Sequence, residues 1–244
     1  MKRYIVLVVC LFAVSTAHAI LIYNITWDNP PHRVGRPPAV DLTGSSSDRP
    51  RDAQKVVIRD DVDIFDNEPV AVFTDQGYAY LAFRPAMTET VSTSGTHLLT
   101  WSAAVLSFSH SQLTTAVRAD NFYFNCHFLN SGRISVVPGE DLDGITWSLG
   151  NVYDFEMLFD LDNHLFSFSI DGKSCYEVAL SEDVAFYGFQ FGRIPYYGGA
   201  YSPRTGELAI DNIRWEYTPK AIPEPTTLGL LLLGSGLLAA KRKK

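Results

Sequence analysis

The sequence predicts an all-β protein, an antiparallel two-sheet sandwich with a hydrophobic segment at each end of the chain. Three observations lead to this prediction. Apolar and polar residues alternate with a period of two over many short runs, which is the pattern of half-buried strands. Clusters of Gly, Pro, Asn and Asp separate these runs, as turns separate the strands of a sandwich. No stretch between the two ends repeats at 3.6 residues over the length of a helix.

The first 19 residues predict a secretory signal peptide. Lys2 and Arg3 form a basic start, an apolar run follows, and Ala17 and Ala19 give the small-x-small pattern of a signal peptidase site. Cleavage after Ala19 would start the mature chain at Ile20. The body of the protein is therefore expected on the far side of the inner membrane.

The predicted strands follow the alternating runs in chain order. A first strand is expected at 21–27, and 28–54 is expected to form a loop because prolines and glycines recur there. Around 160–164, two amphipathic runs flank a short polar segment, which predicts a hairpin. The remaining strands are predicted at 70–73, 78–83, 98–108, 121–129, 133–137, 152–160, 165–171, 184–191 and 208–217.

The chain divides into four parts: a signal peptide (1–19), a first strand with its loop (20–54), a sandwich body (55–219) and a C-terminal tail (220–244). Six of the 20 basic residues lie in residues 1–19 and 226–244, and none of the 27 acidic residues lies there. Residues 20–225 thus carry 14 basic and 27 acidic residues, a formal charge of −13. This charge argues against nucleic acid and anionic lipid as partners and tolerates neutral polysaccharide or divalent cations.

Two cysteines, Cys126 and Cys175, remain after the signal peptide is removed. In an oxidising compartment they predict a disulfide; the alternative is two separate buried thiols. No spacing typical of a zinc site occurs. His127 follows Cys126 but lies on the opposite face by strand alternation, which argues against a thiol protease.

The C-terminal tail has three parts in order. Pro223, Glu224 and Pro225 form a rigid extended motif, an uncharged leucine-rich run spans 226–240, and a basic stop ends the chain. The run is short for a membrane span, but long cationic side chains at its end extend its reach. The four residues of the basic stop are Lys241, Arg242, Lys243 and Lys244.

This tail closely resembles the PEP-CTERM sorting signal of Gram-negative bacteria. The resemblance implies a transmembrane helix that holds the body at the inner membrane, followed by processing by exosortase, a membrane protease or transpeptidase. It also implies a setting at the cell surface or in the extracellular matrix, with exopolysaccharide and biofilm. An ordinary uncleaved C-terminal anchor is the alternative.

The body resembles the concanavalin-A-like (laminin-G-like) jelly rolls, on the runs 153–162, 166–172 and 206–213. The resemblance implies a jelly-roll sandwich and a structural calcium ion near the first and last strands. Asp211 matches the final-strand aspartate of those modules, and Asp28 and Asn29 would lie near it. Carboxylate and amide oxygens suit calcium.

No catalytic motif stands out, so the sequence predicts that the protein is not an enzyme. Glu156 and Asp160 share a strand face, but their spacing departs from the acid pair of laminarinase-like hydrolases. The segment 140–144 is read as a polar turn. Aromatic side chains are candidates for carbohydrate binding because tyrosine and tryptophan rings stack on sugars; these are Tyr196, Tyr197, Tyr201 and Trp147.

Together these features predict an exported, exosortase-sorted surface or matrix protein that is non-catalytic and associated with polysaccharide. Two alternatives stay open: a divergent glycan hydrolase or lyase on the same fold, and a tail-anchored envelope protein that is never cleaved. Loss of glycan cleavage when Glu156 or Asp160 is replaced would favour the first alternative. Detection of Lys244 in the mature protein would favour the second.

Overall fold

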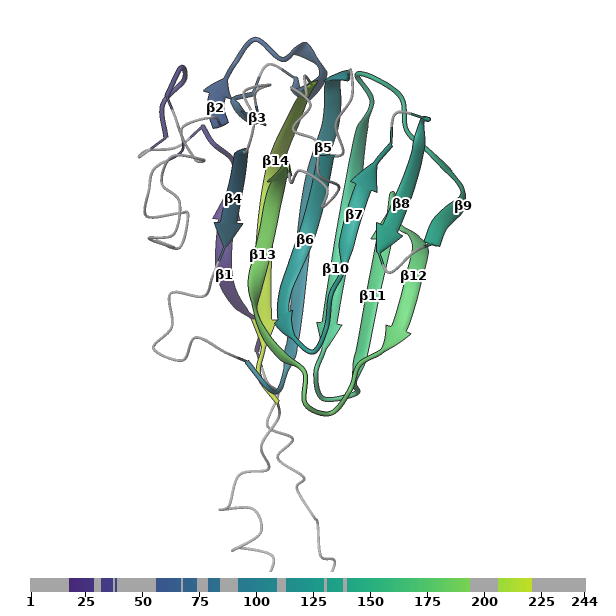
Figure 1. Cartoon of the computed structure of the whole chain (residues 1–244). Helices are drawn as coiled ribbons and strands as arrows, with labels where there is room; N and C mark the ends of the chain where they lie inside the picture. The colour runs from purple at the N-terminus through teal and green to yellow at the C-terminus, as the bar shows by residue number, and fades with distance from the viewer. Residues whose placement is uncertain are drawn as a thin grey trace, which may run out of the picture.

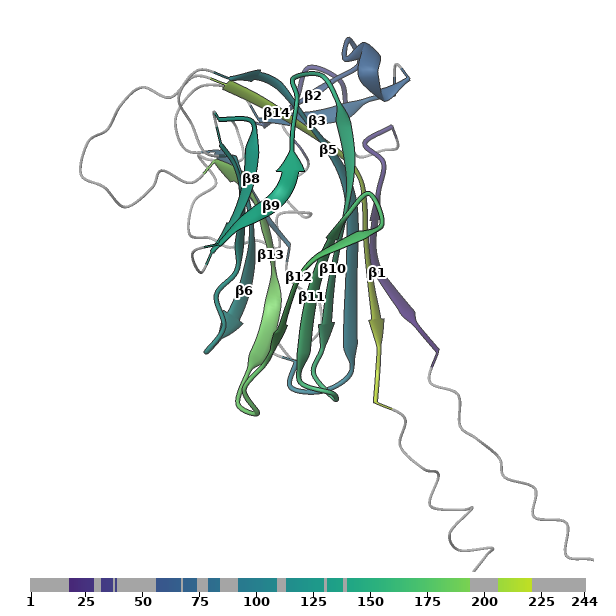
Figure 2. The same ribbon diagram turned by 90° about the vertical axis from the view of Figure 1, so that its right-hand side faces the viewer.

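Two antiparallel sheets face each other as the layers of a sandwich (Figure 1, Figure 2). The computed structural model describes residues 18–220 except for short segments at 29–31, 37, 39–55, 67, 74–78, 84–91, 109–112, 130, 138–139 and 194–205. The predicted all-β sandwich is confirmed. The predicted signal peptide through Ala17 and the tail from residue 221 lie outside the described residues.

The larger sheet has eight strands in the order β12-β11-β10-β5-β14-β3-β2, with β1 paired to β14 beside β3. Long strands in its centre give it a continuous apolar inner face. Their bounds are β1 Ile20–Ile25, β2 Val56–Arg59, β3 Val70–Phe73, β5 Thr96–Phe108, β10 Val152–Asp160, β11 Leu165–Ile170, β12 Lys173–Ala179 and β14 Gly206–Thr218.

The smaller sheet has six strands in the order β4-β13-β6-β7-β8-β9. Every pairing between named strands in it is antiparallel. Their bounds are β4 Ala79–Phe83, β6 Leu113–Asp120, β7 Asn125–Phe128, β8 Arg133–Val137, β9 Glu140–Thr146 and β13 Ala185–Arg193.

The sequence located most strands of the two sheets. The predicted runs at 70–73, 133–137 and 152–160 coincide with β3, β8 and β10, and the hairpin between β10 and β11 is confirmed. Strands β2, β6, β9 and β12 were not predicted. In particular, the segment 140–144 forms most of β9 rather than a polar turn, and a short 3-10 helix spans Asp63–Phe65.

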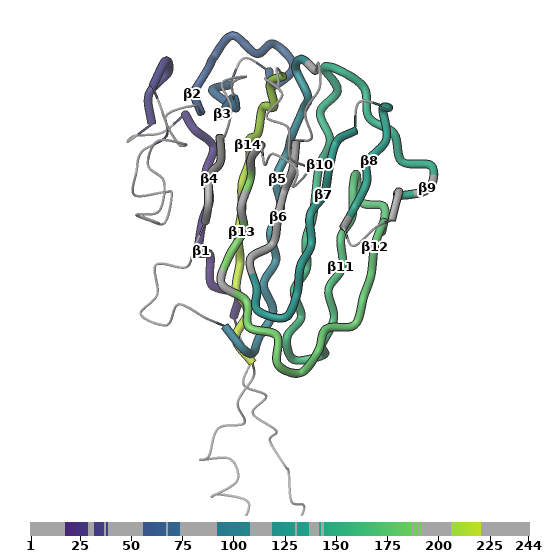
Figure 3. Tube along the Cα trace, viewed as in Figure 1, coloured from purple at the N-terminus to yellow at the C-terminus, as the bar shows by residue number. Residues whose placement is uncertain are grey.

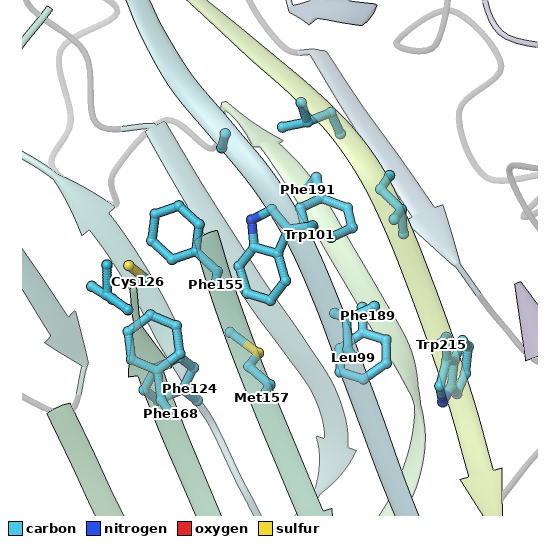
Figure 4. Packing of buried hydrophobic residues seen from close by; sticks show 14 of the residues in the cluster. Leu99, Trp101, Phe124, Cys126, Phe155, Met157, Phe168, Phe189, Phe191 and Trp215 are labelled. Carbon is cyan, nitrogen blue, oxygen red and sulfur yellow. The ribbon is translucent and has the colours of Figure 1, made fainter. Parts of the chain in front are cut away.

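Aromatic rings fill the space between the sheets (Figure 4). Trp101 on β5 stacks on Phe155 with ring centroids 5.1 Å apart and meets the edge of Phe191, from the facing sheet, at 5.3 Å. Phe124 packs on Phe168 at 5.2 Å. Because each ring buries a large apolar area, these contacts are the main term that holds the layers together.

The two described ends of the chain lie side by side at one end of the sandwich (Figure 2, Figure 3). Ile20 pairs with Tyr217, so the start of β1 lies against the end of β14. Within the part of the chain described, no helix is long and apolar enough to cross a membrane. The predicted transmembrane helix falls beyond residue 220 and stays a prediction.

The predicted disulfide is not formed, and both cysteines are free. Cys126 lies in the core on β7, whereas Cys175 lies on β12 of the other sheet, at a bulge opposite Phe168 and Ser169. The thiol of Cys175 donates a hydrogen bond to the Lys173 carbonyl 3.0 Å away. Burial raises the pKa of both thiols, and the nearby Cys175 raises that of Cys126 further, so both stay protonated near pH 7.

Candidate functional site

The outward face of β7 carries two buried polar side chains, Asn125 and His127. Cys126 and Phe128 belong to the core between the sheets, so the alternate residues on this strand point the other way. Asn125 is nevertheless only 3% exposed and His127 only 7%. Buried polar groups on an outward sheet face are the kind of feature that marks a ligand site.

Among the described residues, neither ring nitrogen of His127 has a hydrogen-bond partner, and the side-chain oxygen of Asn125 has none either. Desolvation lowers the pKa of His127 to about 4, because burial disfavours the charged imidazolium. The imidazole is therefore neutral near pH 7 and offers one free lone pair and one free N–H. The lone pair can therefore accept, and the N–H can donate, a hydrogen bond to a bound molecule.

The neighbours of His127 extend the site along and across the sheet. The amide of Asn125 donates a hydrogen bond to the hydroxyl of Tyr123, which is 61% exposed. Across the sheet, His127 is opposite Thr114 on β6 and Ser135 on β8. In register, His127 thus lies between β6 and β8, in the middle of three adjacent strands.

A second polar cluster lies on the outward face of the eight-stranded sheet. Asp211 on β14 is 1% exposed, and one of its carboxyl oxygens has no hydrogen-bond partner. Desolvation, together with the charges of Glu68 and Asp28, raises the pKa of Asp211 to about 6. Among the residues described, no three of His, Cys, Asp and Glu are grouped closely enough to hold a metal ion. Asn29, the other predicted ligand, lies outside them.

The predicted carbohydrate-binding aromatics are not supported by the described residues. Trp147 is 7% exposed, and its indole N–H donates to the Leu129 carbonyl 2.8 Å away. Its ring meets Phe128 edge-on in the core, so the prediction that Trp147 stacks on a sugar is wrong. The other three candidates, Tyr196, Tyr197 and Tyr201, lie outside the described residues.

The acidic residues of the β10–β11 hairpin have structural roles. Asp160 accepts hydrogen bonds from the backbone and the side-chain amide of Asn163 at 3.0 and 2.7 Å. Asp162 accepts one from the Gly95 backbone at 3.0 Å and lies 3.5 Å from the Lys220 ammonium. Glu156 is exposed on the sheet. These contacts fit a polar edge and not an acid pair for hydrolysis.

The sequence contained part of the signal for the β7 site. Alternation correctly places His127 on the face opposite Cys126. What it does not reveal is that this outward face is buried as well, since a strand pattern distinguishes only one side of a sheet from the other. The burial is a property of the folded chain that alternation alone does not predict.

Comparison with family models finds the PEP-CTERM protein-sorting motif at residues 221–244. The chain carries a PEP-CTERM sorting signal. The predicted motif residues Pro223, Glu224 and Pro225 lie within it, as does the basic stop from Lys241 onward. Because the motif is a signal for exosortase, the protein is a secreted one that is processed at the membrane. A comparison with curated proteins found no relative.

Among solved structures, the body is similar to alginate lyases of polysaccharide lyase family 7. Alginate lyase AlgAT5 is 15% identical, with a TM-score of 0.53 over 80% of this chain and 94% of that one. Alginate lyase A1-II′ is 12% identical, with a TM-score of 0.51 over 66% and 83%. At such identities the likeness establishes the fold, a jelly-roll-like β-sandwich.

These structures correct one prediction from the sequence. The absence of a recognisable catalytic motif predicted a protein that is not an enzyme. The fold is instead one on which enzymes that cleave polysaccharides are built, and the absence of the laminarinase acid pair does not bear on lyase chemistry. Catalysis therefore has to be judged from the site itself.

Proposed function

We propose that this protein is an exported polysaccharide lyase, sorted by its PEP-CTERM signal and released at the cell surface or into the matrix. The observation that carries the proposal is His127, a neutral imidazole with both nitrogens unpartnered on a buried polar face. The likeness of the body to alginate lyases supports the same reaction class. A uronate-containing polysaccharide is the substrate class that this chemistry requires.

The reaction is a β-elimination in which His127 acts as the general base. The imidazole takes the proton from the ring carbon next to the sugar carboxylate. The electron pair of that C–H bond forms a double bond to the neighbouring carbon, and the bond from that carbon to the glycosidic oxygen breaks. The departing oxygen takes a proton from water. A positioned general base contributes about 10²–10⁴-fold to such a step.

Asn125 is suited to hold the sugar while the proton is removed. Its carbonyl oxygen is buried and unpartnered, and its amide already bonds to Tyr123. A substrate hydroxyl that donates to this oxygen would satisfy it. Hydrolysis is less well supported, because it uses two carboxyl groups at defined separation and the buried polar pair on this face is an imidazole and an amide.

The experiment is cleavage of alginate and of polygalacturonate by the full-length chain purified in detergent, followed by the ultraviolet absorbance of the unsaturated sugar formed. His127→Asn is expected to lower kcat at least about 100-fold. Its matched control is His164→Asn, an exposed histidine in the β10–β11 turn whose positive φ of 53° asparagine also accepts.

The pH dependence gives a second readout of the same site. Because the base must be neutral and the pKa of His127 is lowered to about 4, kcat/KM should fall as the pH drops through about 4, and not through the ordinary 6.5. Unchanged cleavage by His127→Asn, or no unsaturated product from either polysaccharide, would refute the proposal.

We also propose a structural calcium ion at Asp211. The buried oxygen without a partner is the specific observation in its favour, since a cation would satisfy it and would also offset the repulsion from Asp28 and Glu68. Because no three acidic side chains among the described residues are grouped closely enough to hold the ion, backbone carbonyl oxygens would have to complete the coordination. The ion would stabilise the sheet and take no part in the reaction.

A further inference from the structure

Tyr123 is placed to bind sugar on the same face as the proposed catalytic histidine. Phe122 packs on Phe159 and Phe166, and Phe124 is fully buried in the core. Tyr123, between them, is 61% exposed and therefore points outward, to the side of Asn125 and His127. It is one of a small number of large hydrophobic side chains that the described surface exposes.

The Tyr123 ring is also held in place. The amide of Asn125 donates a hydrogen bond to its hydroxyl, and Asn125 itself is buried. A tyrosine with one end fixed presents its ring with little loss of side-chain entropy on binding. Aromatic rings of this kind stack on the apolar faces of sugars while the hydroxyl stays hydrogen-bonded.

Spacing along the strand separates this contact from the reaction. At roughly 3.3 Å per residue, Tyr123 and His127 lie about 13 Å apart along the chain. The Tyr123 hydroxyl reaches Asn125, so the ring lies between the levels of residues 123 and 125, about 7 Å or more along the strand from His127. That separation is longer than one sugar ring, so the Tyr123 ring is suited to a neighbouring sugar of the same chain. Asn125 lies between the two.

We propose that Tyr123 forms a separate subsite that stacks on a sugar ring and, through Asn125, fixes which sugar of the chain meets His127. Tyr123 is a positioning residue and takes no part in proton transfer. The glycan then runs along β7 rather than across the sheet. The inference rests on the proposed function for the site but concerns binding, which is measured separately from cleavage.

The test compares Tyr123→Ala and Tyr123→Phe with Leu149→Ala, a control that removes another exposed apolar side chain, 57% exposed, from a turn before β10. Both the retention of the full-length protein on immobilised alginate and its kcat and KM on soluble alginate are measured. Tyr123→Ala should raise KM and weaken retention about three- to tenfold, with kcat unchanged. Tyr123→Phe should show a smaller increase, because it keeps the ring and loses only the bond to Asn125.

The outcomes separate the two proposals. If Tyr123→Ala weakens retention while the wild type forms no unsaturated product, the subsite stands and the lyase function fails. If the wild type cleaves alginate and Tyr123→Ala matches Leu149→Ala in KM and retention, the subsite is wrong and the lyase function stands. An equal loss of kcat and of thermal stability in Tyr123→Ala would also overturn it, since this would indicate a structural role.

Discussion

Two buried histidines have different surroundings, one between the sheets and one on an outward face. His97 is 2% exposed between the sheets, where its Nδ1 accepts a hydrogen bond from the Trp215 indole at 3.2 Å and its ring stacks on Tyr217. Burial lowers its pKa to about 3. His127 is neutral for the same reason, but it lies on an outward face with both nitrogens unused. The difference lies in the face of the sheet and in the hydrogen bond to Trp215, which His97 accepts and for which His127 has no counterpart among the described residues.

Asp211 allows a prediction at the same scale. Its pKa is raised to about 6 in the folded protein against about 3.9 in an unfolded chain, so folding stability falls as the pH rises from about 4 to about 6. Without calcium, Asp211→Asn should therefore stabilise the protein at pH 7 by on the order of 2 kcal/mol. With calcium, only the wild type should gain stability.

Thermal unfolding in chelator and in calcium measures both effects, with Glu182→Gln as an exposed acidic control. Equal calcium responses of the wild type and Asp211→Asn would remove Asp211 from the proposed site.

At the scale of elements, the strands that the sequence missed have a common position. β2, β9 and β12 are the outer strands at sheet edges. The polar β9 and the exposed β12 bury little of themselves, so their residues need not alternate, and they do not. β2 buries Val56 and Ile58 but is only four residues long, too short for a clear pattern. Strands with one well-buried face, such as β10 and β11, alternate clearly and were predicted to within a residue. β6 is the exception, an inner strand rich in Thr and Ala.

Gly95, directly before β5, allows a prediction about how two strands meet. Gly95 has a φ of +80°, and a Cβ there would lie 2.6 Å from both the Thr218 carbonyl oxygen and the Tyr217 ring. Gly95→Ala should therefore destabilise the fold by about 2–4 kcal/mol, since it adds overpacking to backbone strain. Gly172→Ala is the matched control, because Gly172 also has a positive φ but nothing within 4 Å.

The denaturant midpoints of the two glycine variants separate the cost of overpacking from the cost of backbone strain. The control should lose only about 1 kcal/mol. Equal losses would mean that backbone strain alone accounts for the requirement for glycine and that the contact with the end of β14 does not matter.

At the scale of the whole molecule, the negative charge of the protein repels the proposed substrate. The exported body carries a formal charge of −13 over residues 20–225, and a uronate polymer is also negative. Association should therefore become faster as salt increases toward about 0.15 M, because salt screens the repulsion. Stopped-flow binding of alginate at several ionic strengths measures this. A rate that falls with salt would mean that a local basic patch controls the encounter.

The fold and the C-terminal sorting signal could be predicted from the sequence, whereas the polar site on β7 could be predicted only in part. Alternation and turn residues specify strands, and the tail carries its signal in consecutive residues such as Pro223 and Glu224. The β7 site is different, because the burial of Asn125 and His127 on an outward face is a property of the folded chain that strand alternation does not predict. The aromatic candidate Trp147 failed for the same reason, since its burial is a property of the packed sandwich.

The pairing at the ends of the chain has a mechanical consequence. The tail leaves from β14, which is bonded to β5 on one side and to β1 and β3 on the other. A pull on the tail therefore loads an inner strand with hydrogen bonds on both sides, while a pull on the N-terminus loads β1, which is bonded to β14 alone. A body that hangs from its C-terminal end is thus suspended by its strongest strand and not by its weakest.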